Sequence, residues 1–319
     1  MKTKPVFVYK GDALTKYNFG QEHPFGPKRH AAFHDKLERL SLGASLHIAP
    51  PSRATVDQLA LFHTSSYIDL VSRASEDGKG FLDHGDTPAF IGVFEAASDV
   101  VGTTLAAIDA IMHGQAHRAF SPIGGLHHAR RDKAGGFCVF NDCGVAIHYL
   151  RENYDIQRIL YVDIDAHHGD GVFYDFEDDA ELLFADIHQD GNTLYPGTGA
   201  SNETGIGGAV NTKINLSLPP GATDNEFTEA WSQVENYVMD NPPEFIILQC
   251  GADSLAGDPI TQLMLTEASH RMAASSLCQM ADRYCNGRIL GLGGGGYNLL
   301  NIAKAWTQVI EAFVVDPKS

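Results

Sequence analysis

Short, uninterrupted hydrophobic runs alternate along this chain with longer segments in which apolar positions recur every three or four residues. The uninterrupted runs predict buried β-strands, and the periodic segments predict amphipathic helices. The predicted strands are residues 6–9, 118–120, 158–165, 181–187, 213–218, 244–251 and 288–293. The predicted helices are residues 26–40, 93–114, 141–153, 224–240, 266–286 and 299–314. Strands that are apolar throughout and separated by helices are typical of a parallel sheet covered on both faces, so we predict an α/β fold.

The alternation continues along the whole sequence, with no Pro-, Ser- or Gly-rich linker and no internal repeat. The chain has 319 residues, of which 44% are hydrophobic, and this is enough for a substantial core. We therefore expect a single domain over residues 1–319.

Polar residues follow the carboxyl ends of four predicted strands, where parallel sheets bind their ligands. They are His127 and His128, Asp165 and His167, Asp253, and Tyr297. Because these strand ends lie at one edge of the sheet, the residues are expected to converge there, although they are far apart in the sequence.

The stretch YVDIDAHHGDG (161–171) contains the first candidates for a metal site. In an extended segment, residues two apart point the same way, so Asp165 and His167 can reach one point. Asp253 from another strand end completes a set of three ligands, which is typical of catalytic zinc and also suits Fe²⁺. Alternatively, these side chains pair with one another or cap helices, but the convergence of several strand ends favours a metal.

Two further acids, Asp163 and Asp170, are left over for the tandem His127 and His128. A carboxylate bonded to each imidazole fixes its tautomer and raises its pKa. Two such pairs beside a metal-activated water suit hydrolysis of an amide, because one imidazole accepts a proton from the water and one delivers a proton to the leaving amine. His168 is expected to be a structural residue.

The segment GLGGGGYN (291–298) matches the Gly-x-Gly-x-x-Gly pattern of dinucleotide-binding sites. The acid required after a second strand would be Glu311, but Glu311 lies in a segment with helical periodicity, so we reject this match. Alternatively, the glycines let the backbone pass close to a substrate, and Tyr297 stabilises an oxyanion.

Composition narrows the choice of function. A net charge of −17 disfavours a nucleic-acid binder. No apolar run is long enough to span a membrane and the N-terminal residues lack a signal-peptide core, so we expect a cytoplasmic protein. The five cysteines form no CxxC pair and are odd in number, which predicts buried, reduced thiols.

Six motifs in order, GGLHHARR, GFCVFND, DIDAHHGDG, YPGTG, QCGADSLAGD and GLGGGGYN, resemble the histone deacetylase superfamily. The resemblance is strongest to bacterial members of the acetoin-utilisation type and extends from about Arg29 to Trp306. It implies the arginase/deacetylase fold, with about eight mainly parallel strands flanked by helices. It also implies a zinc-dependent deacetylase that removes acetyl or other short acyl groups from an acyl-lysine peptide or a small acylated amine.

The resemblance also assigns roles by motif position. It implies Asp165, His167 and Asp253 as zinc ligands, His127 and His128 as the acid/base pair backed by Asp163 and Asp170, and Tyr297 as the group that polarises the scissile carbonyl. It implies Phe137 and Tyr195 as walls of an acyl-lysine channel beside Gly136, Asp86 as the rim acid, and Arg29 near an acetate exit. A structural K⁺ would use Asp163 and the carbonyl groups of Asp165 and His167, with Asp186 in place of the family's usual serine ligand.

Two departures bear on the substrate. Leu126 replaces the aromatic residue that often precedes the histidine pair, which indicates a looser inner pocket. Ile260 stands where polyamine-specialised relatives carry an acid, which argues against polyamines, although the net charge of −17 keeps cationic substrates open. The alternatives are therefore an acetylpolyamine amidohydrolase, an arginase-like ureohydrolase with two metals, and a non-catalytic protein that binds acyl ligands. The sequence leaves the oligomeric state open.

Overall fold

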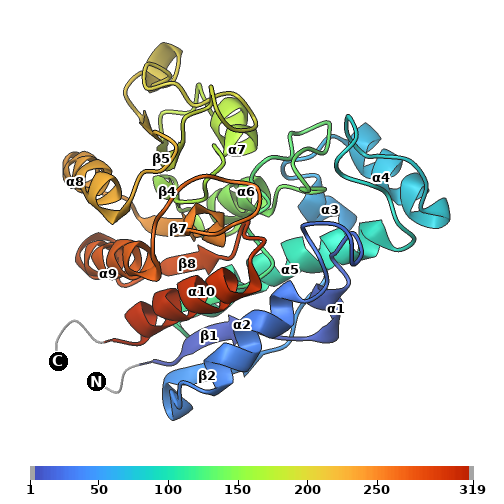
Figure 1. The fold of residues 1–319 in the computed structure, drawn as a ribbon, viewed down its shortest axis with the longest axis horizontal. Helices are drawn as coiled ribbons and strands as arrows, with labels where there is room; N and C mark the ends of the chain where they lie inside the picture. The colour runs from blue at the N-terminus through green and yellow to red at the C-terminus, as the bar shows by residue number, and fades with distance from the viewer. Residues whose placement is uncertain (1–3, 316–319) are drawn as a thin grey trace.

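Eight parallel strands form one sheet in the order β2-β1-β3-β8-β7-β4-β5-β6 (Figure 1). The computed structural model describes residues 4–315; residues 1–3 and 316–319, the two ends of the predicted domain, lie outside the described residues. The strands are β1 Val6–Tyr9, β2 Leu46–Ala49, β3 Arg118–Ser121, β4 Ile159–Asp163, β5 Leu182–Gln189, β6 Lys213–Leu218, β7 Phe245–Gln249 and β8 Ile289–Leu292. The predicted α/β fold with a parallel sheet is thereby confirmed.

Helices cover both faces of the sheet (Figure 1). The α-helices are α1 Asp12–Thr15, α2 Arg29–Glu38, α3 Val56–Leu59, α4 Ser65–Asp77, α5 Val93–Met112, α6 Asp142–Tyr154, α7 Asp170–Asp175, α8 Asp224–Asp240, α9 Glu267–Tyr284 and α10 Leu299–Val314. The short 3₁₀ turns are η1 Gly43–Ser45, η2 Gly207–Ala209 and η3 Ala252–Ser254. Helices α2, α8, α9 and α10 pack over one hydrophobic cluster, and α5 and α6 pack over another.

Local sequence explains where several helices begin and end. Thr223 caps α8, and Glu226 completes a capping box with it, so that two of the helix's first N–H groups have acceptors. Asn141 caps α6 by accepting from the N–H of Gly144. Helix α4 ends at Gly78 with φ 63°, the left-handed conformation that glycine adopts without strain.

The seven predicted strands and six predicted helices are all present, whereas the eighth strand, β2, and the helices α1, α3, α4 and α7 were not predicted. The four residues of β2, LHIA, include an exposed Ile48 and lie at the edge of the sheet, so the run is short and only partly apolar. All five cysteines are buried and unpaired, as predicted. Within residues 4–315, no helix is both long enough and apolar enough to span a membrane.

The polar candidates follow β3, β8, β7 and β4, which are adjacent strands at the centre of the sheet. Each of these strands is buried along its whole length. Their carboxyl ends therefore deliver four loops to one edge from a rigid support.

Candidate active site

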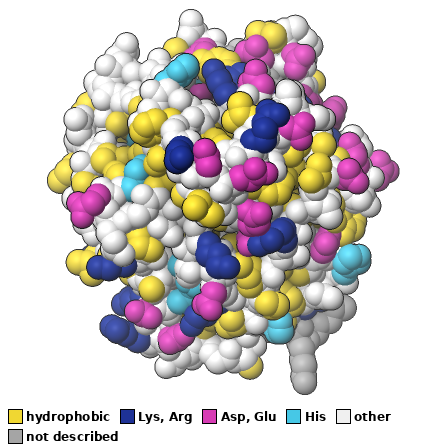
Figure 2. All heavy atoms as spheres, turned by 90° about the vertical axis from the view of Figure 1, so that its right-hand side faces the viewer, with side chains coloured by type: hydrophobic (Ala, Val, Ile, Leu, Met, Phe, Trp, Pro, Cys, Tyr) yellow, Lys and Arg dark blue, Asp and Glu magenta, His cyan; other side chains and the backbone are white. Residues whose placement is uncertain are grey.

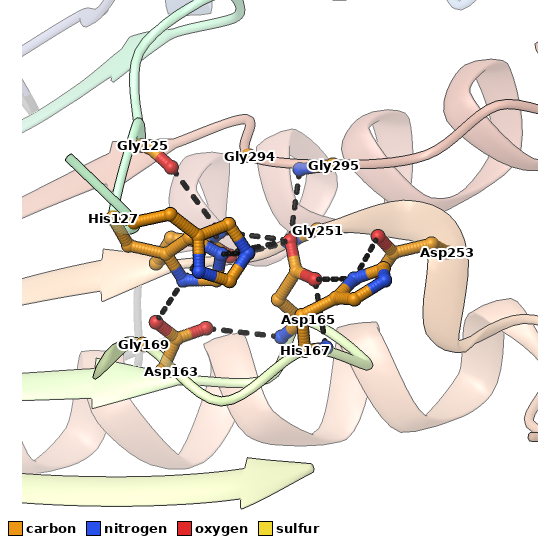
Figure 3. A network of polar contacts seen from close by, with 12 residues as sticks. Gly125, His127, Asp163, Asp165, His167, Gly169, Gly251, Asp253, Gly294 and Gly295 are labelled. Atoms are coloured by element: carbon orange, nitrogen blue, oxygen red, sulfur yellow. Dashed lines mark hydrogen bonds and ion pairs between the residues drawn. The ribbon is translucent and has the colours of Figure 1, made fainter. Parts of the chain in front are cut away.

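Asp165, His167 and Asp253 converge at the carboxyl edge of the sheet, as predicted (Figure 3). Asp165 and His167 follow β4, and Asp253 lies in η3 after β7. One potential ligand atom from each residue lies within 4.8 Å of the others. Nδ1 of His167 is 3.0 Å from Oδ1 of Asp165 and 3.1 Å from Oδ2 of Asp253, and all three side chains are buried.

The two carboxylates are held in orientation by hydrogen bonds to their other oxygens. Oδ2 of Asp165 accepts from Nε2 of Gln249 and from the backbone N–H of Gly295, each at 2.8 Å. Oδ1 of Asp253 accepts from the N–H of Ala166 at 2.9 Å. Donors of this kind orient metal ligands in proteins, and here they leave one oxygen of each carboxylate directed at His167.

Glycines make this close approach possible. A Cβ atom at Gly251 would overlap the Asp165 carboxylate, and one at Gly295 would overlap the Asp253 carboxylate. Gly295, in GLGGGGYN, and Gly251, in QCGADSLAGD, therefore bring backbone close to the ligand candidates.

The electrostatics of the three residues favour a bound cation. Burial and the charge of Asp165 raise the pKa of Asp253 to about 7. Burial alone would lower the pKa of His167, but the two carboxylates outweigh it and raise this pKa to about 10. A divalent cation would neutralise these two buried carboxylates. Two carboxylate oxygens and one imidazole nitrogen fit Zn²⁺ or Fe²⁺ with an open coordination position.

The tandem histidines form the two predicted His–Asp pairs. Nδ1 of His127 is 2.8 Å from Oδ2 of Asp163, and Nδ1 of His128 is 2.7 Å from Oδ1 of Asp170. The hydroxyl of Tyr161 also donates to Oδ2 of Asp163, at 2.6 Å. The Nε2 atoms of the two histidines are 3.1 Å apart.

The two imidazoles differ in protonation. Burial would lower the pKa of His127, but Asp163 and Asp165 raise it to about 9. Burial and the neighbouring charge of His127 lower the pKa of His128 to about 4. At neutral pH, His127 is therefore a cation, whereas His128 is neutral, with its proton on the Nδ1 that faces Asp170 and its lone pair on Nε2. Divergent pKa values of this kind are typical of acid/base sites.

Tyr297 lines a small inner cavity together with both histidines and with Asp165 and His167. The cavity has about 10 Å³ of free volume, the room of a single water molecule. Burial and the charges of Asp253 and Asp165 hold the pKa of Tyr297 well above its usual range. Its hydroxyl is therefore a hydrogen-bond donor at neutral pH.

The predicted channel residues lie next to this cavity. A Cβ atom at Gly136, which has φ 51°, would overlap the ring of His128, so a side chain is excluded there. The ring centroid of Tyr195 is 5.1 Å from that of His128, and the Phe137 centroid is 5.8 Å from that of Tyr297. Phe137 and Tyr195 thus flank the approach to the histidine pair and Tyr297.

The remaining predicted residues lie farther out or behind the site. Asp86 is exposed and, with Tyr195, lines an outer cavity of about 320 Å³; partial burial and Asp83 raise its pKa to about 6. Arg29 is buried and donates to the carbonyl groups of Gly294 and Gly296, so it holds the loop before Tyr297. Leu126 lines the inner cavity. Ile260 is half-buried in the loop after Asp258 and lines neither cavity.

Asp186, which stands in place of the serine expected to bind potassium, has a protein hydrogen-bond partner at each carboxylate oxygen. Its Oδ1 is 2.7 Å from Nδ1 of His188, and its Oδ2 accepts from the N–H of Gly169 at 2.8 Å. Oδ1 of Asp163 accepts from the N–H of Asp165 at 3.1 Å. The potassium ion stays a prediction.

Three buried residues that support the site were not singled out from the sequence. Gln249 links Asp165 to the loop after β3, through Nε2 to the carbonyl of Gly125 at 3.3 Å. Asp142 accepts from the N–H groups of Gly125 and Leu126. Asp258 accepts from the N–H of Tyr297 at 2.8 Å. Gln249 and Asp258 fall within the motif QCGADSLAGD, and Gln249 is the last residue of the buried strand β7, so this motif was the available signal.

Comparisons with known proteins agree with this architecture. A sequence profile described as "Histone deacetylase domain" matches residues 23–313. The acetoin utilization protein AcuC of Bacillus subtilis (strain 168) is 38% identical, over 98% of this chain and 83% of that protein. Histone deacetylase clr6 of Schizosaccharomyces pombe is 34% identical, over 96% and 76%, and histone deacetylase 8 of Danio rerio is 33% identical, over 96% and 79%. A solved structure titled "Crystal Structure of HDA15 HD domain" superposes with a TM-score of 0.89 at 27% identity, over 99% of this chain and 90% of that one.

Proposed function

The chain belongs to the histone deacetylase family, and we propose that it is a zinc-dependent deacetylase that removes acetyl or other short acyl groups. The substrates would be acyl-lysine side chains or small acylated amines. The observation that carries this proposal is that one inner cavity is lined by two of the metal-ligand candidates, both histidines of the His–Asp pairs and Tyr297.

Asp165, His167 and Asp253 would hold the metal ion, which when bound lowers the pKa of water and polarises a carbonyl group. Neutral His128 accepts the proton of the attacking water at Nε2, and Asp170 stabilises the imidazolium that forms. His127 carries a positive charge next to the reacting atoms, and Asp163 compensates this charge. Protonated His128 then delivers its proton to the leaving amine.

Tyr297 would donate a hydrogen bond to the acyl oxygen as negative charge develops on it. Its high pKa keeps the proton on its hydroxyl, and Asp258 and Arg29 hold its loop in place. Phe137 and Tyr195 suit the methylene stem of an acylated lysine, because aromatic side chains pack closely on an apolar chain.

The alternatives have less support. A two-metal ureohydrolase needs a second group of ligands, and among the described residues one cluster of three or more possible metal ligands is found. An acetylpolyamine substrate would benefit from an acid at Ile260, which is apolar here. The cytoplasmic location stays a prediction.

Acetate release from an acetyl-lysine peptide and from small acetylated amines, by zinc-loaded protein with and without a chelator, tests the proposal. We expect release that the chelator abolishes and that zinc restores. A folded, metal-loaded sample that binds the substrates but releases no acetate from any of them would instead support a non-catalytic binding protein.

A further inference from the structure

A groove of about 710 Å³ lies beside the channel wall and takes no part in the chemistry described above. One wall is residues 16–20, which follow α1, and the other is residues 88–92, which precede α5. These two segments meet at the right of Figure 1, where the N-terminal end of α5 lies next to α1. The groove is within the size range of ligand-binding sites.

The lining of the groove is apolar at its centre. The rings of Phe19 and Phe90 pack edge to face, with centroids 5.8 Å apart. Ile91 is 76% exposed, the highest value among the large hydrophobic side chains that the structure describes. Figure 2 shows this side of the molecule, on which hydrophobic side chains alternate with charged ones rather than forming one continuous patch. Ile91 is therefore free to contact a molecule that binds in the groove.

The charged groups around the groove largely neutralise one another. Arg53 forms two hydrogen bonds with Asp99, at 2.6 and 2.9 Å. Glu95 accepts from Ser75 at 3.0 Å and is opposite in charge to Lys16 across the lining. The lining itself carries Lys16, Arg53 and Glu95, and Asp99, outside the lining, neutralises Arg53. Because these charges balance, the groove favours an apolar occupant over a phosphate or a carboxylate.

The groove lies next to Phe137, a wall residue of the proposed acyl-lysine channel. The Phe19 centroid is 6.5 Å from that of Phe137. Tyr17, from one wall, donates to the carbonyl of Phe137 at 2.7 Å, and the N–H of Phe137 donates to Thr87, which directly precedes the other wall, at 3.0 Å. Residues 86–92 thus form one continuous segment that begins at the rim residue Asp86 and ends in one wall of the groove.

We propose that this groove binds an apolar side chain of a peptide or protein substrate, two to four residues from the acyl-lysine. The separation follows from the ring spacings of 6.5 and 5.8 Å between Phe137, Phe19 and Phe90, since an extended chain advances about 3.3 Å per residue. The inference rests on the proposed deacetylase function and narrows its substrate from acylated amines in general to acylated peptides.

A peptide series tests it. Acetyl-lysine peptides with alanine at all flanking positions are compared with peptides that carry a single Leu or Phe between four residues before and four residues after the acetyl-lysine. We expect one position, two to four residues away, at which the apolar residue raises kcat/KM about 10- to 100-fold, the effect of burying one large apolar side chain. The gain should appear mainly in KM, because the groove is remote from the reacting atoms.

The ratio of kcat/KM between the apolar peptide and the alanine peptide is then measured in Ile91→Asp and in Met239→Asp. Met239 is 53% exposed near the end of α8, away from the groove, and serves as the matched control. We expect the ratio to fall to near one in Ile91→Asp and to persist in Met239→Asp. A ratio near one in the wild type, or an unchanged ratio in Ile91→Asp, overturns the inference and leaves the deacetylase proposal standing.

Two other outcomes also decide against it. If the wild type sediments as a dimer and Ile91→Asp as a monomer, the groove is covered by a second copy of the chain rather than by substrate. If no acetylated compound is hydrolysed by folded, metal-loaded protein, the proposed function fails and this inference fails with it.

Discussion

Replacement of Gln249 by leucine should weaken metal binding without altering any metal ligand. Gln249 is the last residue of β7 and is completely buried. Its amide donates to Oδ2 of Asp165 at 2.8 Å, and its Oε1 accepts from the N–H of Gly251 at 2.7 Å. Gln249→Leu keeps a similar volume but removes one of the two donors to Oδ2 of Asp165; the other is the N–H of Gly295.

The size of the expected loss of zinc affinity follows from the hydrogen bond between Gln249 and Asp165 that is removed. A hydrogen bond to an ionised group contributes about 1.5–3 kcal/mol. Because the oriented carboxylate is a metal ligand, most of this loss should appear as metal affinity weakened about 10- to 100-fold, the usual effect of removing a group that orients a ligand. The measurement is competition for Zn²⁺ between the protein and a chromophoric chelator at fixed pH.

Gln189→Leu is the matched control for this experiment. Gln189 is the last residue of β5 and is equally buried, but its side chain bonds to Thr193 and Gln262 rather than to a metal ligand. Both variants should lower the free energy of unfolding of the metal-free protein, since each leaves a backbone N–H without its acceptor. Equal zinc affinity in the two variants would refute the orienting role of Gln249.

Further predictions concern the reacting groups. Tyr297→Phe should lower kcat by about 10²- to 10³-fold with little change in KM or zinc affinity, the usual effect of losing an oxyanion donor; a large rise in KM alone would contradict this role. The pH profile of kcat/KM should rise as His128 loses its proton and fall at higher pH as His127 loses its proton, because burial and the charge of His127 lower the pKa of His128 whereas Asp163 raises the pKa of His127. His127→Asn should therefore abolish the alkaline limb, and a profile that keeps this limb would assign it to another group. Gly136→Ala should lower kcat at least 10-fold through overlap with the ring of His128, whereas Gly207→Ala, at a similar φ of 55° in open space, should leave kcat unchanged. Equal kcat in the two alanine variants would contradict the steric argument.

Much of the fold and the convergence of the candidate residues could be predicted from hydrophobic periodicity alone. Strands such as 244–251 have an uninterrupted apolar centre, Phe245 to Leu248, and the residues after parallel strands must lie at one sheet edge whichever order the strands take. The edge strand β2 could not be predicted in this way, because Leu46–Ala49 is only four residues long and mostly exposed, so its pattern carries no burial signal.

The supporting residues of the site were harder to identify. Gln249 has an ordinary position in a strand, and its role depends on the separation between β7, β4 and the loop after β3, which only the folded chain defines. The opposite protonation of His127 and His128 likewise depends on their contact at 3.1 Å, whereas the sequence indicated a raised pKa for both. The groove beside Phe137 arises from two segments about seventy residues apart and has no motif of its own.

The most direct test of the central claim is a metal titration of activity. Metal-free protein is titrated with Zn²⁺ while acetate release from an acetyl-lysine peptide is followed. We expect no release without metal and a linear rise that ends at one zinc ion per chain, because Asp165, His167 and Asp253 form a single set of ligands. Full activity in the metal-free protein, or a rise that ends only at two ions per chain, would contradict a mononuclear metal-dependent deacetylase.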